Sequence, residues 1–133
     1  MAYKSNRNVV FSCKYHVVWC PKYRRRVLVD GVDGRPEAIL EDVAKETRSE
    51  ILEMEVMPDH VHILVEVDPQ FGIDALIIRM KGRSSFLLGQ EFPRLALRLP
   101  ALWTNPCFVS TVGGAPLAVV KQYIESQKRS EVR

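Results

Sequence analysis

Residues 51–67, ILEMEVMPDHVHILVEV, contain two runs of alternating apolar and polar residues separated by Pro58-Asp59. Successive side chains of a β-strand point to opposite faces, so each run is typical of a half-buried strand. Proline and aspartate are favoured in turns, and they join the two runs into a predicted β-hairpin. The residues expected in its core are Leu52, Met54, Val56, Val61, Ile63, Val65 and Val67.

The flanking segments predict the other elements of the fold. Apolar and polar residues alternate over 11–19, which predicts a strand, and a second strand is predicted over 107–112, before Gly113-Gly114. Helical spacing of apolar residues predicts a helix from Pro36 to about Ser49, a second helix over 70–88 and a last one from Pro116 to Gln127. Segment 92–106 is rich in proline and leucine and carries no assignment.

The predicted order is strand, helix, strand, strand, helix, strand, helix. The first six elements indicate an α+β fold with a ferredoxin-like or RRM-like antiparallel sheet, βαββαβ, and helices mainly on one face. The seventh element is an added C-terminal helix that carries Tyr123. Because the chain has 133 residues and no internal repeat or linker, we expect residues 1–133 to form a single domain.

Composition excludes several classes of protein. The chain is 47% hydrophobic and 26% charged, which is ordinary for a globular protein and excludes disordered and fibrous classes. No apolar run reaches the roughly 18 residues of a membrane-spanning helix, and the polar start lacks a signal peptide. We therefore expect a cytoplasmic protein without a membrane partner. Cys13, Cys20 and Cys107 form no C-x-x-C pair and are expected to be reduced thiols.

Charge is distributed unevenly along the chain. The formal net charge is only +3, yet residues 1–29 contain many bases and no acid, whereas residues 37–55 are strongly acidic. Further basic clusters lie at 79–83 and 121–133. Any one cluster alone is better explained as a solvated face, but three of them favour a nucleic-acid partner, because neutralising phosphates releases counterions.

His60 and His62 are the most informative residues of the hairpin. In a strand they project from one face while Val61 and Ile63 turn to the core, and two neutral imidazoles on one face can share a divalent metal. The same pattern also fits an inert surface pair. Asp59 could orient a ligand histidine or belong to a plain turn, and His16 could reach substrate or make a structural hydrogen bond.

Tyr123 and Gln127 lie four residues apart and share one face of the predicted last helix. A possible nucleophile and a possible third metal ligand therefore lie on the same face of this helix. From these residues alone, the better interpretation is that Tyr123 is a boundary aromatic with its hydroxyl in water and that Gln127 is a solvated side chain.

Taken together, these residues resemble a known family, the TnpA-like single-tyrosine HUH transposases of the smallest insertion sequences, with REP-associated tyrosine transposases as relatives. The resemblance spans nearly the whole chain. The matching stretches are Tyr15-His16-Val17-Val18-Trp19, Lys22-Tyr23-Arg24, Met57 to Leu64, Lys81-Gly82, Ser84-Ser85, Leu102-Trp103, Ser110 to Gly113 and Tyr123 to Gln127.

The resemblance implies a metal-dependent chemistry on DNA. It makes His60, His62 and Gln127 the ligands of Mg²⁺ or Mn²⁺ and Tyr123 the nucleophile that attacks a DNA phosphate, giving a 5′-phosphotyrosine intermediate and a free 3′-hydroxyl. The implied substrate is single-stranded DNA with hairpins near the element's ends. Candidate contacts to the hairpin backbone are Lys22, Arg24, Arg25, Arg26, Arg79, Lys81 and Arg83.

The resemblance also implies a homodimer with shared active sites, in which the tyrosine helix of one subunit can complete the histidine site of the other. Gly113-Gly114 suits a hinge for that exchange and equally suits an ordinary turn before a helix.

Two alternatives to an insertion-sequence transposase remain. One is a domesticated HUH nuclease acting on repeated palindromes, which genomic context would distinguish. The other is a non-enzymatic RNA-binding module on a ferredoxin-like sheet, but the basic-Gly-aromatic strand motif of those modules is absent from the sequence. A purely hydrolytic phosphoesterase would need a water-activating base that the residues do not identify.

Overall fold

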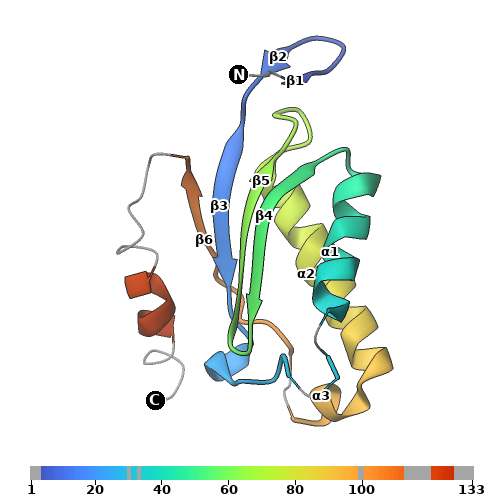
Figure 1. The fold of residues 1–133 in the computed structure, drawn as a ribbon, viewed down its shortest axis with the longest axis vertical. Helices are drawn as coiled ribbons and strands as arrows, with labels where there is room; N and C mark the ends of the chain where they lie inside the picture. Colours follow the sequence, from blue (N-terminus) through green and yellow to red (C-terminus); the bar gives the residue numbers. More distant parts are fainter. Residues whose placement is uncertain (1–3, 30, 33, 99–100, 113–120, 128–133) are drawn as a thin grey trace.

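A computed structural model describes residues 4–29, 31–32, 34–98, 101–112 and 121–127. Figure 1 shows a curved sheet with helices α1 and α2 packed on one side. The strands are β1 (Lys4–Ser5), β2 (Val10–Phe11), β3 (Lys14–Trp19), β4 (Glu50–Met57), β5 (His60–Glu66) and β6 (Phe108–Thr111). The helices are α1 (Arg35–Glu46), α2 (Ile73–Glu91) and α3 (Pro93–Arg98), and a short 3₁₀ turn covers Lys22–Arg24.

The main sheet has the strand order β4-β5-β3-β6, and all its neighbouring strands are antiparallel. This confirms the predicted mixed α+β fold with an antiparallel sheet. The core lies between this sheet and the helices, and most of its fully buried side chains come from β3, β5, α1 and α2. They include Val17, Trp19, Val61, Ile63, Ile39, Leu40, Leu76 and Met80.

The predicted hairpin is confirmed as β4 and β5, with the turn at Pro58-Asp59. Its inward pattern differs at one position, because the register shifts between Ile51 and Glu53. A bulge of this kind re-aims side chains. Leu52, predicted in the core, is therefore exposed, and Ile51 packs against the core instead.

The prediction of one strand over 11–19 is wrong at its start. Phe11 belongs to β2, which pairs with β1 in a separate two-stranded sheet. The main-sheet strand begins only at Lys14 because its partners end there: Lys14 pairs with Glu66, the last residue of β5, and Tyr15 with Thr111, the last of β6.

The helices also depart from the predicted limits. The first ends at Glu46 rather than near Ser49, because Arg48 adopts a left-handed backbone (φ 57°) and the Thr47 hydroxyl donates to the Val43 carbonyl. The second begins at Ile73 and runs through to Glu91, beyond the predicted limit. Helix α3 lies in the segment that carried no prediction.

Residues 121–127 are helical, in agreement with the end of the last predicted helix. Figure 1 shows this segment beside β6, across the sheet from α1 and α2. The Gly113-Gly114 pair and the predicted helix start at Pro116 lie outside the described residues. No helix in the described part of the chain is long and apolar enough to cross a membrane.

Candidate functional site

The two histidines of β5 lie on the face of the sheet that α1 and α2 do not cover. Val61 and Ile63 are fully buried in the core, while His60 and His62 are half-buried on the opposite face, as the alternation of a strand requires. The predicted common face of the histidine pair is confirmed by this pattern.

Strand register places the Tyr123 segment on that same face. Val18 of β3 pairs with His62 on one side and with Phe108 of β6 on the other, so these three residues form one row across the sheet. The rings of Phe108 and Tyr123 pack with their centroids 5.2 Å apart. Tyr123 therefore lies over β6, which is two strands away from His62 on β5. Directly opposite residues on neighbouring strands of a sheet are about 5 Å apart.

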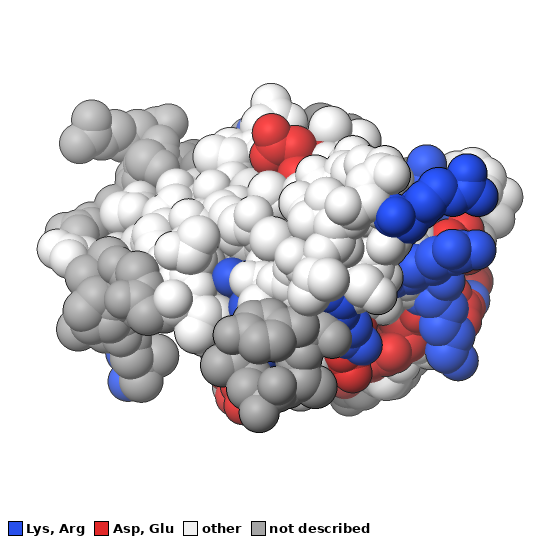
Figure 2. Space-filling model, turned by 90° about the horizontal axis from the view of Figure 1, so that it is seen from above, with Lys and Arg blue, Asp and Glu red and all other residues white. Residues whose placement is uncertain are grey.

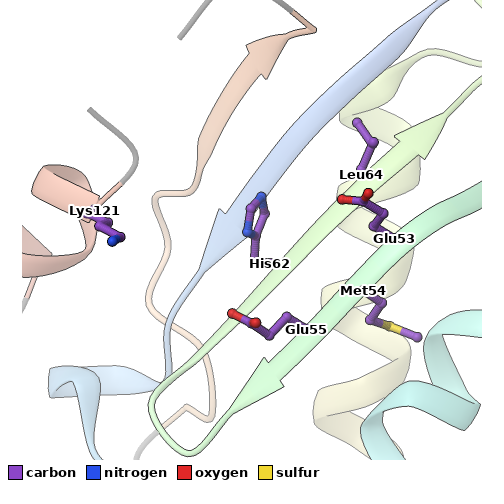
Figure 3. Close-up of a pocket in the computed structure, with 6 residues that line it drawn as sticks. All are labelled: Glu53, Met54, Glu55, His62, Leu64 and Lys121. Carbon is purple, nitrogen blue, oxygen red and sulfur yellow. The ribbon is translucent and has the colours of Figure 1, made fainter. Parts of the chain in front are cut away.

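A polar cavity of about 450 Å³ lies between the sheet and the helical segment 121–127. Glu53, Glu55 and His62 line it from the sheet, and Lys121 lines it from the helical segment (Figure 3). The remaining lining residues are Met54 and Leu64. Charged groups of both signs therefore line the cavity together with His62.

Asp59 orients His60. The Nδ1 atom of His60 lies 2.9 Å from Oδ1 of Asp59, and Nε of Arg24 donates to Oδ2 at 2.8 Å. Burial acts to raise the pKa of Asp59, but the hydrogen bonds from His60 and Arg24 and the Arg24 charge hold that pKa below its usual value. An ionised carboxylate accepts a hydrogen bond from Nδ1–H of His60, and a carboxylate partner of this kind is common for histidines that bind a metal ion through Nε2.

His62 has a different neighbour. Its Nε2 atom lies 3.2 Å from Nδ1 of His16 on β3, and the two rings are tilted with centroids 5.4 Å apart. Burial, followed by the neighbouring His16, lowers the pKa of His62. A lowered pKa favours the neutral form of the imidazole, which is the form that can bind a metal ion.

Gln127 lies one helical turn beyond Tyr123 and is half-buried, as is Tyr123, whose hydroxyl oxygen is buried. Among the described residues, no group of three or more His, Cys, Asp or Glu side chains is arranged to hold a metal ion. The two imidazoles would thus need an amide such as Gln127, water or substrate to complete a coordination shell. The roles predicted for His60, His62, Gln127 and Tyr123 stay predictions.

The seven basic residues predicted to contact DNA fall into two groups. Three are engaged within the protein: Arg24 with Asp59, Arg83 with both carboxylate oxygens of Glu46, and Lys81 with the carbonyls of Thr104 and Asn105. Lys22 and Arg25 lie 5.7 and 5.9 Å from the Tyr23 ring, Arg79 lies over Phe71, and Arg26 is exposed.

Basic surface on the helical side is mixed with acidic surface. Figure 2 shows Lys and Arg side chains gathered at one edge with Asp and Glu among them. The ion pairs Arg83–Glu46 and Arg35–Glu91 each join α1 and α2. The exposed bases of the turn after β3 are therefore the better candidates for contacts to phosphate.

Sequence reasoning missed the contacts that join the site. Arg24 donates to the Ile124 carbonyl across 100 residues of sequence, and Phe108 meets Tyr123 only through the fold. His16 contacts the His62 ring and Asp59 contacts the His60 ring, which agrees with the hydrogen-bonding interpretation of each residue. No rule of sequence spacing predicts the contacts of Arg24 with Ile124 and of Phe108 with Tyr123.

Comparisons with known proteins agree on one family. Residues 9–127 match the family model described as "Transposase IS200 like". The chain is 38% identical over 130 residues to the ISDra2 transposase TnpA of Deinococcus radiodurans, covering 96% of this chain and 93% of that protein. It is 32% identical over 126 residues to the transposase of insertion sequence IS200 from Salmonella typhimurium, covering 93% and 82%.

Solved structures show the same similarity. A crystal structure of a candidate transposase from Deinococcus radiodurans matches with a TM-score of 0.82 and 36% identity, covering 93% of this chain and 97% of that one. A REP-associated tyrosine transposase bound to a REP hairpin matches with a TM-score of 0.58 and 12% identity, covering 91% and 68%, which shows a shared fold.

Proposed function

The chain belongs to the IS200-like transposase family, and from this premise we propose that it cleaves and rejoins single-stranded DNA at the ends of an insertion sequence through Tyr123. A transposase of this family is a DNA cleavage and strand-transfer enzyme. The proposed substrate is DNA with hairpins near the element's ends, and the proposed active form is a homodimer of single-domain chains.

The observation that carries the proposal is the packing of Tyr123 on Phe108. This contact sets the tyrosine on the face of the sheet where His60 and His62 project. The strand order β4-β5-β3-β6, with α1 and α2 on the other face, supports a ferredoxin-like frame with an added helix for the tyrosine.

In the proposed reaction the Tyr123 oxygen attacks the scissile phosphorus in line, and the 3′-oxygen of the preceding nucleotide leaves and takes up a proton. The products are a 5′-phosphotyrosine linkage and a free 3′-hydroxyl. Because the phosphodiester bond is exchanged rather than hydrolysed, a second 3′-hydroxyl can attack the adduct and rejoin strands, which releases the tyrosine.

Tyrosine has an ordinary pKa of about 10, so the phenol is a weak nucleophile at neutral pH. The protein contributes position: Phe108 holds the ring, and the sheet holds both imidazoles. His60 and His62, with Gln127, are the residues proposed to hold Mg²⁺ or Mn²⁺. A bound divalent ion would polarise the scissile phosphate and stabilise charge in the transition state. Asp59 accepts a hydrogen bond from His60, and this contact supports the proposed role of His60 as a metal ligand.

Labelled DNA tests the proposal. A single-stranded oligonucleotide from the sequence flanking the gene, labelled at its 3′ end, should give a protein-linked band on a denaturing gel with Mg²⁺ or Mn²⁺. The same oligonucleotide labelled at its 5′ end should give a shortened product without protein. Tyr123→Phe should abolish the adduct and keep hairpin binding. An adduct that persists in Tyr123→Phe would remove Tyr123 from the reaction.

A further inference from the structure

The guanidinium of Arg24 joins two segments that are far apart in sequence. Its Nε atom donates to Oδ2 of Asp59 at 2.8 Å. Its other end donates to the backbone carbonyl of Ile124 at 3.2 Å and lies 3.3 Å from a carboxylate oxygen of Glu125. The side chain is only 14% exposed. A guanidinium that is mostly shielded from solvent and has acceptors at both ends is fixed in place more firmly than a surface arginine.

Each end of this bridge touches a residue next to the proposed chemistry. The second oxygen of Asp59 accepts from Nδ1 of His60, one of the two histidines proposed to hold the metal ion. Ile124 directly follows Tyr123, the proposed nucleophile. One side chain therefore connects the orientation of His60 with the position of the tyrosine segment.

The backbone around Arg24 is shaped for this contact. Tyr23 and Arg24 have φ values of 62° and 50°, in the left-handed region that residues with a side chain seldom adopt. Backbone hydrogen bonds hold the turn: Arg24 donates to the Pro21 carbonyl and Lys22 to the Leu102 carbonyl, both at 2.8 Å, and Arg25 donates to the Lys22 carbonyl at 3.4 Å. Strained residues of this kind persist where surrounding contacts hold them, and they cluster at functional sites.

We propose that Arg24 is a positioning residue that holds the Tyr123 segment of its own chain against the Asp59–His60 pair. The catalytic meaning of this link rests on the proposed function, because it takes Tyr123 as nucleophile and His60 as metal ligand. Coupling between two sites is reciprocal. Docking of the tyrosine segment therefore favours the metal-binding orientation of His60, and a metal ion on His60 favours docking.

Hydrogen exchange on the full-length protein without DNA tests the link directly. Arg24→Gln should raise amide exchange in residues 121–127 several-fold, while exchange in β5 and α2 stays at the wild-type rate. Arg25→Gln is the matched control, since Arg25 is exposed on the same turn and its ring contact is with Tyr23. It should leave residues 121–127 at the wild-type rate.

Asp59→Asn provides a second variant if Arg24→Gln disturbs the whole fold. Among the described residues, Asp59 contacts Arg24 and His60, and its link to the tyrosine segment runs through the guanidinium. Faster exchange confined to residues 121–127 in Asp59→Asn supports the link. Wild-type exchange in that segment, in Asp59→Asn and in any folded Arg24→Gln protein, overturns it.

Metal affinity and cleavage give independent readouts. With Mn²⁺ as the probe ion, Arg24→Gln should weaken binding by about 10-fold, as expected when the support of a ligand histidine is lost. In single-turnover cleavage it should slow adduct formation without changing hairpin affinity, and equal losses in both would identify a DNA contact and overturn the proposal. If the wild-type protein forms no adduct at all, the proposed function fails, while the exchange experiment still decides whether Arg24 holds the segment.

Discussion

The Nδ1 atom of His16 lies 3.2 Å from the Nε2 atom of His62. One ring must donate and the other accept, so the Nε2 atom of His62 is engaged by another histidine. Any ion that binds His62 through Nε2 has to displace this contact. The His16 ring therefore competes with the metal ion for the same atom.

This competition predicts that His16→Ala tightens metal binding. A hydrogen bond contributes about 0.5–1.5 kcal/mol, so releasing His62 from His16 should strengthen Mn²⁺ binding about 2- to 10-fold. Titration calorimetry of the two proteins at one pH provides the measurement, and His62→Ala should lose most of the binding. Weaker binding in His16→Ala would instead make His16 a ligand or a support of the site.

Phe108 positions the nucleophile, and its removal should slow cleavage. Aromatic pairs contribute about 0.5–1.5 kcal/mol beyond the area that they bury, so Phe108→Ala should lower the single-turnover rate of adduct formation about 2- to 10-fold. Hairpin affinity should not change. Val109→Ala is the control, because Val109 is the next residue of β6, pairs with the buried Val17 and points to the other face of the sheet. An unchanged rate in Phe108→Ala would show that the ring contact does not position Tyr123.

The sequence predicted the parts of the fold that follow a local period. The hairpin and the paired face of His60 and His62 could be read from alternation, because a strand's side chains must alternate whatever their partners are. Alternation could not reveal where β3 begins, since that limit is set by where Glu66 and Thr111 end the neighbouring strands. Alternation also could not reveal the register shift between Ile51 and Glu53 that leaves Leu52 exposed.

The candidate site was predictable in its residue types and not in its contacts. Motif resemblance selected His60, His62 and Tyr123, but it grouped Arg24 with the bases expected to contact DNA. The fold instead pairs Arg24 with Asp59 and with the segment after Tyr123. A short sequence window cannot distinguish an exposed arginine from a shielded one, because burial depends on elements that are distant in sequence.

Arg83 stabilises the packing of α1 and α2, and its effect should depend on pH. Its two hydrogen bonds to Glu46 lower the pKa of that carboxyl. The stabilisation is therefore present above the ordinary glutamate pKa of about 4.3 and is lost as the pH falls through the lowered pKa of the folded state. Glu46→Gln should lower Tm at pH 7. The difference in Tm between this variant and the wild-type protein should become smaller as the pH falls into the acid range.

The control for that experiment is Glu41→Gln, an exposed glutamate on the same helix. Thermal unfolding followed by circular dichroism across the acid range gives the measurement. A Tm difference for Glu46→Gln that stays constant from neutral to acid pH would contradict an ionised pair, because a packing effect does not depend on the protonation of the carboxylate.

The half-buried Lys22 and the exposed Arg25 and Arg26 lie in the turn after β3, and we expect them to carry the salt dependence of hairpin binding. Lys22 and Arg25 flank the Tyr23 ring, and Arg26 follows in an exposed position. Each phosphate contact changes the slope of log K against log salt by about 0.7 for single strands and 0.9 for duplex. Lys22→Gln, Arg25→Gln and Arg26→Gln should therefore each reduce the slope by nearly one, measured by fluorescence anisotropy with a labelled hairpin.

Arg83→Gln removes the same charge from the surface and is the matched comparison. Its guanidinium is already neutralised by Glu46, so its variant should keep the wild-type slope. If Arg83→Gln lowers the slope as much as Lys22→Gln does, net charge rather than position controls binding, and the turn after β3 loses its assignment as the DNA contact. If only the turn variants lower it, the hairpin backbone lies against the end of β3, next to the Asp59–His60 pair.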